Sequence, residues 1–186
     1  MKKIKKENEE KILKMIEKAG DSEKNKVSWD VEGIPYEIQK KSNIKKGKLS
    51  RAQGGRFELK VRGELESRGW FMDKWNNNVD LEKGDLVKAK RKYNPFKKML
   101  VVGTGFPDFV AFKKAGEESY DVIGVEVKMN GVLSKIEKEK CAWYLRKEIF
   151  NRILIAKKGE KRGEVKYDNF LGKYGKKYNN SLDKNL

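Results

Sequence analysis

Two short apolar runs around one polar turn constrain the fold of this chain more than any other feature. The runs are FPDFVAF (106–112) and YDVIGVEVK (120–128), and the segment between them, KKAGEES, is polar and contains a glycine. Both runs are rich in β-branched and aromatic residues, which favours two strands joined as a hairpin. A hairpin folded symmetrically about this turn places Asp108 opposite Glu126.

Strand periodicity predicts that the charged residues share one face. Side chains alternate along a strand, so Asp108 lies on the same face of the first strand as Val110. By the same rule, Glu126 and Lys128 share a face of the second strand with Gly124. Two carboxylates and an ammonium group are therefore expected to converge.

Opposed carboxylates repel one another, and a divalent metal ion between them removes that repulsion. Such an ion polarises a phosphoryl oxygen and activates water, while an adjacent lysine can orient the water or stabilise transition-state charge. Asp108, Glu126 and Lys128 therefore form a candidate catalytic set for phosphodiester hydrolysis.

The surrounding sequence predicts a mixed sheet covered by helices. In the segment 56–69, Phe57, Val61 and Leu65 form one helical stripe, and a strand follows through about residue 75. Further β-rich and helical runs are expected at 99–103, 134–150 (helix), 152–158 and 164–168. This order is typical of an α/β or α+β layer.

We expect three regions in the 186 residues. An N-terminal helical and basic extension (1–50) contains an amphipathic helix over 1–20, and a flexible lead-in extends to residue 55. The main domain (51–170) carries a long inserted loop or short hairpin at 79–99. A polar, basic tail (171–186) is expected to be disordered.

The charge balance predicts a polyanionic partner. The chain has 45 Lys and Arg against 28 Asp and Glu, a formal net charge of +17 and a sequence pI near 9.7. A heat-adapted surface is also lysine-rich, but such surfaces carry glutamate in comparable numbers. Nucleic acid is the expected partner.

The chain contains no histidine and one cysteine, Cys141. These absences exclude Ser-His-Asp hydrolases, imidazole-dependent nucleases, Cys/His zinc sites and an intramolecular disulfide. No run approaches the roughly 20 apolar residues of a membrane span, and the N-terminus does not resemble a signal peptide. We expect a cytoplasmic protein with no membrane partner.

These residues resemble a known family. Pro107-Asp108 followed by Glu126-Val127-Lys128 at the end of the next strand is similar to the PD-(D/E)xK nuclease signature. The segment GGRFELKVRGELESRGW is similar to the opening of archaeal Holliday-junction resolvases, and Glu58 holds the place of their helical acidic residue. The layout after the motif is similar to that of resolvases and VRR-type nuclease domains.

The resemblance implies a restriction-endonuclease-like fold with a mixed central sheet flanked by helices. It also implies Mg²⁺ or Mn²⁺ held by Asp108, Glu126 and the Val127 carbonyl, with Glu58 assisting, and products that carry a 5′-phosphate. Branched DNA is then the expected substrate and a homodimer the expected assembly. A basic residue of the following helix faces the site in many members, and Lys140 matches it.

Several alternatives stay open at this point. Glu58 can instead form an exposed i,i+4 pair with Arg62, and Lys140 can be a solvated helix residue. The alternative functions are a non-catalytic nucleic-acid-binding protein and an RNA, flap or restriction-type nuclease on the same fold. The expected nucleic-acid contacts are Arg56, Lys88, Lys90, Arg91, Lys92, Lys97, Lys98 and Lys140.

Overall fold

The computed structural model describes residues 6–33, 35–89, 91–94, 99–102 and 105–178. The chain divides into two compact units, an N-terminal unit (1–55) and a sheet unit (56–186). The sequence places this division after residue 50, so the two boundaries differ by a few residues. Among the helices in the described ranges, none combines the length and the apolar character needed to cross a bilayer.

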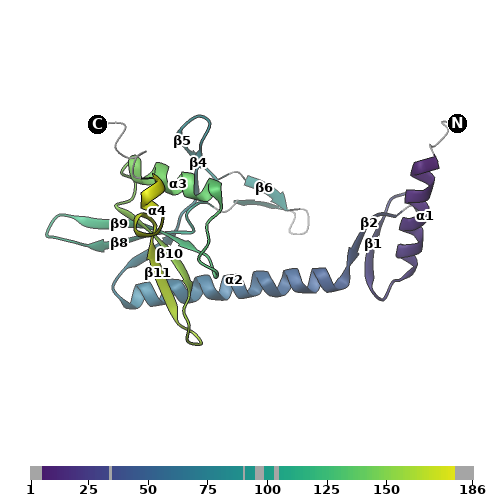
Figure 1. Ribbon diagram of the computed structural model, residues 1–186, viewed down its shortest axis with the longest axis horizontal. Helices are drawn as coiled ribbons and strands as arrows, with labels where there is room; N and C mark the ends of the chain where they lie inside the picture. Colours follow the sequence, from purple (N-terminus) through teal and green to yellow (C-terminus); the bar gives the residue numbers. More distant parts are fainter. Residues whose placement is uncertain (1–5, 34, 90, 95–98, 103–104, 179–186) are drawn as a thin grey trace. The chain divides into compact units, whose positions relative to one another are not determined.

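The N-terminal unit consists of a helix, a hairpin and the first half of a long helix (Figure 1). Helix α1 (Lys6–Gly20) packs against the antiparallel hairpin of β1 (Asn25–Trp29) and β2 (Pro35–Lys40). The amphipathic helix predicted near the N-terminus is thus confirmed for residues 6–20.

Helix α2 (Lys41–Ser67) replaces the predicted flexible lead-in. The prediction of a flexible segment up to residue 55 is wrong because the helix that buries Phe57, Val61 and Leu65 extends backwards through it. Adding residues to an existing helix is far less costly than nucleating a new one. The predicted stripe of three buried residues is confirmed, and Gly69, with φ of 81°, follows the end of the helix.

The sheet unit is built on one five-stranded mixed sheet with the order β11-β10-β9-β8-β3. Its strands are β3 (Phe71–Lys74), β8 (Phe109–Lys114), β9 (Tyr120–Val127), β10 (Arg152–Lys158) and β11 (Val165–Asn169). Strands β9 and β10 are parallel and are joined through α3 (Lys135–Arg146), while the other neighbouring pairs are antiparallel. The predicted mixed α/β layer is confirmed.

Helices cover both faces of this sheet (Figure 1). On one face the buried stripe of α2 packs against Phe109, Ala111, Ile123 and Val125. On the other face α3 and α4 (Phe170–Tyr178) pack with the aromatic residues around Phe150. Two cores therefore lie on either side of one sheet, and alternate residues of β8 and β9 point into each.

The region between β3 and β8 forms two hairpins. Strand β4 (Asn77–Asp80) pairs with β5 (Asp85–Lys88), and β6 (Arg91–Asn94) pairs with β7 (Met99–Val102). The predicted long loop is therefore largely paired strand.

The predicted disorder of the tail is wrong for residues 171–178. This segment belongs to α4, where Phe170 lies 5.6 Å from Tyr174 and 5.7 Å from Tyr178 between ring centroids. These aromatic rings recur at helical spacing and pack against the sheet. The polar composition of the segment as a whole does not indicate this helix. Residues 179–186 lie outside the described residues.

Close packing around Gly124 leaves no room for a side chain at this position of β9. A Cβ at this position would lie 2.9 Å from Pro107 Cγ and 3.1 Å from the Phe150 ring. We therefore expect Gly124→Ala to lower the free energy of unfolding by about 1–3 kcal/mol, because the core is overpacked.

Gly63 supplies the control, since a Cβ on this exposed helical residue meets nothing within 4 Å. Gly63→Ala should stabilise the protein by about 0.5–1 kcal/mol. Urea unfolding of both variants measures the difference, and equal stabilities would contradict the packing argument.

Candidate functional site

The register of β8 and β9 brings Asp108 and Glu126 together. Phe109 pairs with Val125, so the next position outward sets Asp108 against Glu126. The backbone N–H of Asp108 donates to Glu126 Oε2 at 3.1 Å, and the backbone N–H of Val127 donates to Asp108 Oδ2 at 2.9 Å. The predicted juxtaposition of the carboxylates is confirmed, and their catalytic role stays a prediction.

Lys128 lies between two carboxylates. Its Nζ is 3.1 Å from Glu126 Oε1 and 2.6 Å from Glu137 Oε1. Its backbone N–H donates to the Ala156 carbonyl of β10 at 2.9 Å, which continues the sheet pairing past the end of β9. The ammonium group therefore has a fixed position beside Glu126.

A second ion pair approaches Asp108 from α2 and β3. Glu58 Oε2 lies 2.6 Å from Lys74 Nζ, and Lys74 also lies 4.2 Å from the ring centroid of Phe109. The alternative pairing of Glu58 with Arg62 is not the one observed, because Arg62 pairs with Glu66 at 2.8 Å. Both Glu58 and Lys74 act electrostatically on Asp108.

Burial makes both central carboxyls hard to ionise. Glu126 is 3% exposed, and burial together with the neighbouring Asp108 carboxylate raises its pKa to about 8. Burial also raises the pKa of Asp108 and Glu58 adds to the effect, while the Val127 N–H, Lys74 and Lys128 oppose it. Two carboxyls held this close, both with raised pKa values, form a place where positive charge is stabilised.

Lys128 stays protonated despite partial burial. Desolvation lowers the pKa of its ammonium group, but the hydrogen bond to Glu137 and the charge of Glu126 outweigh this, so that the pKa is raised overall. Burial raises the pKa of Glu137, and the hydrogen bonds from Lys128 and Ser134 reverse this, so that its pKa is lowered. The site therefore holds an ammonium group next to a carboxyl whose pKa is raised to about 8.

The position of Glu137 was not predicted from the sequence. It lies in the first turn of α3, where Ser134 and Glu137 form a capping box: Ser134 Oγ accepts from the Glu137 N–H, and Glu137 Oε2 accepts from the Ser134 N–H. The sequence signal was the pattern Ser-x-x-Glu soon after the Glu126-x-Lys128 strand. That pattern predicts a carboxylate at the start of the helix that crosses from β9 to β10.

The donor groups at the site suit a hard metal ion. The carboxylates of Asp108 and Glu126 offer oxygen ligands, which Mg²⁺ and Mn²⁺ prefer. Within the described part of the chain, no three or more His, Cys, Asp or Glu side chains are grouped so that they could hold a metal. Mg²⁺ commonly takes one or two carboxylates and completes its shell with water and substrate phosphate, and the two carboxylates present fit that pattern.

The remaining predicted residues lie elsewhere. Lys140 of α3 donates to Asn78 Oδ1 at 2.7 Å and lies 5.7 Å from the Phe106 ring, so its described contacts are with the β4 segment and the residue before Pro107. Arg56 and Lys88 are exposed, and the backbones of Arg91 and Lys92 lie in β6. Lys90, Lys97 and Lys98 fall outside the described residues.

Searches against protein-family models, curated proteins and solved structures found no match to this chain.

The raised pKa of Glu126 predicts a pH-dependent stability of the metal-free protein. A carboxyl whose pKa rises from 4.5 to about 8 on folding stabilises the fold fully below pH 4.5, and this contribution is lost as the pH rises through 8. Glu126→Gln cannot ionise, so in EDTA it should lose less stability between pH 5 and pH 8 than the unmodified protein. The expected difference is on the order of a few kcal/mol.

Denaturant unfolding of both proteins at the two pH values measures this difference. Asp121→Asn is a control for the loss of one carboxylate, because Asp121 pairs with Arg152 at the opposite end of β9. Parallel stability profiles for Glu126→Gln and the unmodified protein would contradict the assigned burial of Glu126.

Proposed function

We propose that the sheet unit hydrolyses the phosphodiester backbone of DNA with the help of Mg²⁺ or Mn²⁺. The observation that carries the proposal is the pair formed by the half-buried Asp108 and the buried Glu126, with the Lys128 ammonium 3.1 Å from Glu126. Placing two carboxyls this close raises their pKa values and makes ionisation costly, whereas a metal-dependent hydrolase uses such a pair as metal ligands.

Asp108 and Glu126 would hold the metal, with the Val127 carbonyl as a further ligand and Glu58 assisting from α2. When bound, the ion polarises the phosphoryl oxygen and lowers the pKa of a bound water. Hydrolysis joins the water oxygen to phosphorus, breaks the bond from phosphorus to the 3′ oxygen, and passes one proton of the water to that oxygen, which leaves a 5′-phosphate and a 3′-hydroxyl.

Lys128 contributes positive charge where negative charge develops on the phosphate. Its pairing with Glu137 at 2.6 Å restricts the rotamers of the long side chain, so the ammonium group is oriented before substrate binds. Glu137 thus acts as a positioning residue for Lys128. Lys74 plays the corresponding part for Glu58, which it contacts at 2.6 Å.

The arrangement of elements supports a restriction-endonuclease-like domain of the PD-(D/E)xK type. Helix α2 precedes β3, the strands β8 and β9 carry the acidic pair at one sheet end, and α3 leads into the parallel strand β10. The net charge of +17 supports a polyanionic substrate. Branched DNA, and with it a dimer that cuts two symmetric strands, stays part of this proposal.

A second candidate function is nucleic-acid binding without catalysis. One observation favours it: Glu126 already accepts from the Asp108 N–H and from Lys128, so its carboxylate has two partners within the protein. On that interpretation the acidic pair and Lys128 are a structural network. Cleavage assays on junction, flap, nicked and single-stranded DNA and on RNA distinguish the two candidates and test the substrate class.

Asp108→Asn tests the assigned metal site. The amide keeps the shape and accepts the Val127 N–H, but it removes the charge that holds a cation, so cleavage in Mg²⁺ should fall to the level seen in EDTA. DNA binding should persist or tighten, because one charge that repels phosphate is gone. Nicking and gel-shift assays on one substrate measure both, and a folded variant that cuts at the normal rate contradicts the proposal.

Lys128→Ala tests the role of the ammonium group. Because the chain carries 45 Lys and Arg, one lysine contributes little to affinity, but its loss at the reacting phosphate should lower the cleavage rate about 10²-fold or more. Lys157 is a matched control, since it lies on the neighbouring strand β10 and its side chain is 29% exposed against 30% for Lys128.

Lys157→Ala should leave the cleavage rate within a few-fold of normal. Single-turnover rates and dissociation constants for the two variants separate the effects. Equal losses of rate and affinity in Lys128→Ala would make Lys128 a binding residue only.

A further inference from the structure

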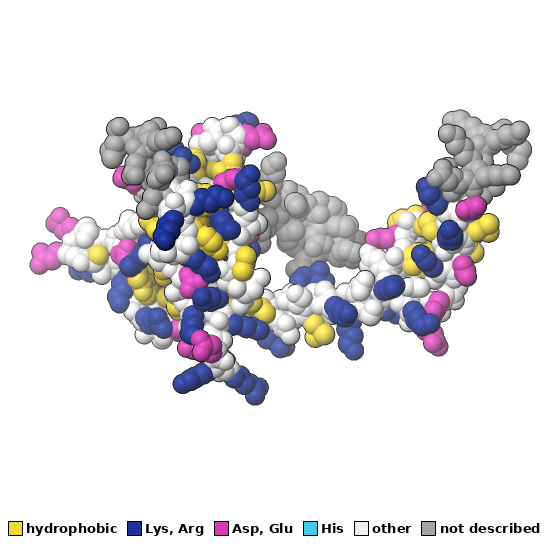
Figure 2. All heavy atoms as spheres, viewed as in Figure 1, with side chains coloured by type: hydrophobic (Ala, Val, Ile, Leu, Met, Phe, Trp, Pro, Cys, Tyr) yellow, Lys and Arg dark blue, Asp and Glu magenta, His cyan; other side chains and the backbone are white. Residues whose placement is uncertain are grey.

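The last residue of β2 and the first turns of α2 form a concentrated cationic surface. Residues 40–51, KKSNIKKGKLSR, are named here the basic segment; they contain six Lys and Arg residues, and the chain has no Asp or Glu between Glu37 and Glu58. All six cations are exposed: Lys40, Lys41, Lys45, Lys46, Lys48 and Arg51. Figure 2 shows dark blue Lys and Arg side chains along α2.

The side chains of the basic segment are poorly suited to a helix. Its first turn has no acidic residue, although the positive end of a helix dipole favours one. Lys41 and Lys45 are a like-charged i,i+4 pair, which is destabilising, and Gly47 has low helix propensity. The buried residues of α2 begin only at Phe57. The segment therefore has the charge pattern of a helix that is stabilised when an anion neutralises it.

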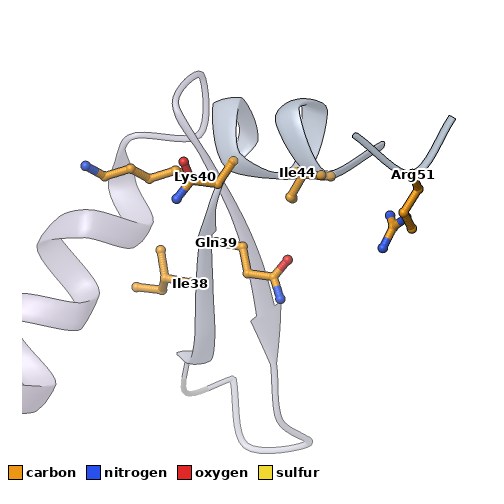
Figure 3. A pocket seen from close by; sticks show the side chains of 7 residues that line it. Ile38, Gln39, Lys40, Ile44 and Arg51 are labelled. Carbon is orange, nitrogen blue, oxygen red and sulfur yellow. The ribbon is translucent and has the colours of Figure 1, made fainter. Parts of the chain in front are cut away.

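A shallow groove of about 480 Å³ lies within the N-terminal unit, and two of the six cations, Lys40 and Arg51, line it. Gln39 of β2 and Asn43, Ile44, Gly47 and Arg51 of α2 line it. In Figure 3, Ile44 and Arg51 point to the side of α2 on which Gln39 lies. A Cβ at Gly47 would meet nothing within 4 Å, so the space beside the helix backbone is open to a partner.

The pattern of charges favours nucleic acid over a membrane. Lys41, Lys45 and Lys48 share one helix face and extend over about 10 Å, given a rise of about 1.5 Å per residue. One DNA strand presents a phosphate about every 3.4 Å of helix axis, so this face matches about three phosphates. Ile44 and Leu49 lie on different sides of the helix, whereas a membrane-bound helix needs one continuous apolar face.

We propose that the basic segment is a second DNA-binding site, separate from the carboxylates of the sheet unit, which binds the sugar-phosphate backbone of duplex DNA. Lys41, Lys45 and Lys48 neutralise phosphates, and Arg51 with the amides of Gln39 and Asn43 supplies further hydrogen-bond donors in the groove. The choice of DNA as the ligand rests on the proposed function. It binds through charge and therefore without sequence preference.

The test compares two triple variants of the full chain. Lys41, Lys45 and Lys48 are changed together to Gln, whose helix propensity is close to that of Lys, so the helix is retained. The matched control changes Lys11, Lys14 and Lys18 of α1 to Gln; these lysines are also exposed, but they lie among Glu10 and Glu17. Circular dichroism verifies that both variants are folded.

Fluorescence anisotropy with a labelled 20-base-pair duplex, in EDTA and at several salt concentrations, is the readout. The slope of log affinity against log salt should fall by roughly 2–3 in the basic-segment variant, at about 0.9 per lost phosphate contact, and by less than 1 in the control. Equal changes in slope for the two variants would mean that only the net charge of the protein matters, and this would overturn the proposal. Loss of binding to phosphatidylserine vesicles with unchanged DNA binding would overturn it as well.

EDTA separates this test from the proposed catalysis. If the basic segment binds DNA as expected while no cleavage occurs under any metal condition, only the proposed hydrolysis fails. If the protein cleaves DNA and the basic-segment variant keeps its salt slope, only the second binding site fails.

Discussion

Two reciprocal hydrogen bonds tie the acidic pair to the backbone of the hairpin. The Asp108 N–H donates to Glu126, and the Val127 N–H donates to Asp108, so each carboxylate accepts a backbone N–H from the opposite side of the hairpin. The pairing of Phe109 with Val125 sets this geometry, and a slip of one strand by one residue would turn its carboxylate to the other face of the sheet. Gly124 permits it, because Pro107 packs where a Cβ would lie.

The helices then add charge to the sheet end from both sides. Helix α3 contributes Glu137 in the first turn after its N-cap, and Glu137 holds Lys128. Helix α2 contributes Glu58, which Lys74 of β3 neutralises at 2.6 Å. Four carboxyls, Asp108, Glu126, Glu58 and Glu137, therefore share two lysines, Lys74 and Lys128. Because carboxyls outnumber ammonium groups here, a further cation would be stabilised between Asp108 and Glu126.

Much of this site was predictable because it depends on short-range rules. Turn symmetry and the two-residue period of a strand are sufficient to bring Asp108 to Glu126 and to set Lys128 beside it. The partners Glu137 and Lys74 were not predicted, since their positions depend on how α3 and β3 pack on the sheet. The pairing of Glu58 likewise went to Lys74, 16 residues away, and not to its helical neighbour Arg62. Sequence spacing predicts an ion pair within a helix correctly only when no residue from another element offers the same side chain a closer partner.

The two halves of α2 show why the composition of the N-terminal region wrongly predicted a flexible segment up to residue 55. In the second half, burial of Phe57, Val61 and Leu65 stabilises the helix at about 1.5–3 kcal/mol for each fully buried side chain. In the basic segment no such burial occurs, and the sequence, rich in Lys, Gly and Ser, is typical of a linker. Both halves nevertheless belong to one helix, because extending a stable helix by further residues costs little free energy.

The first half of α2 therefore carries exposed charge and contributes no buried side chain to the core. Exposed residues that do not contribute to packing can vary without loss of stability. The cationic composition of the basic segment is therefore better explained by binding to a partner than by folding.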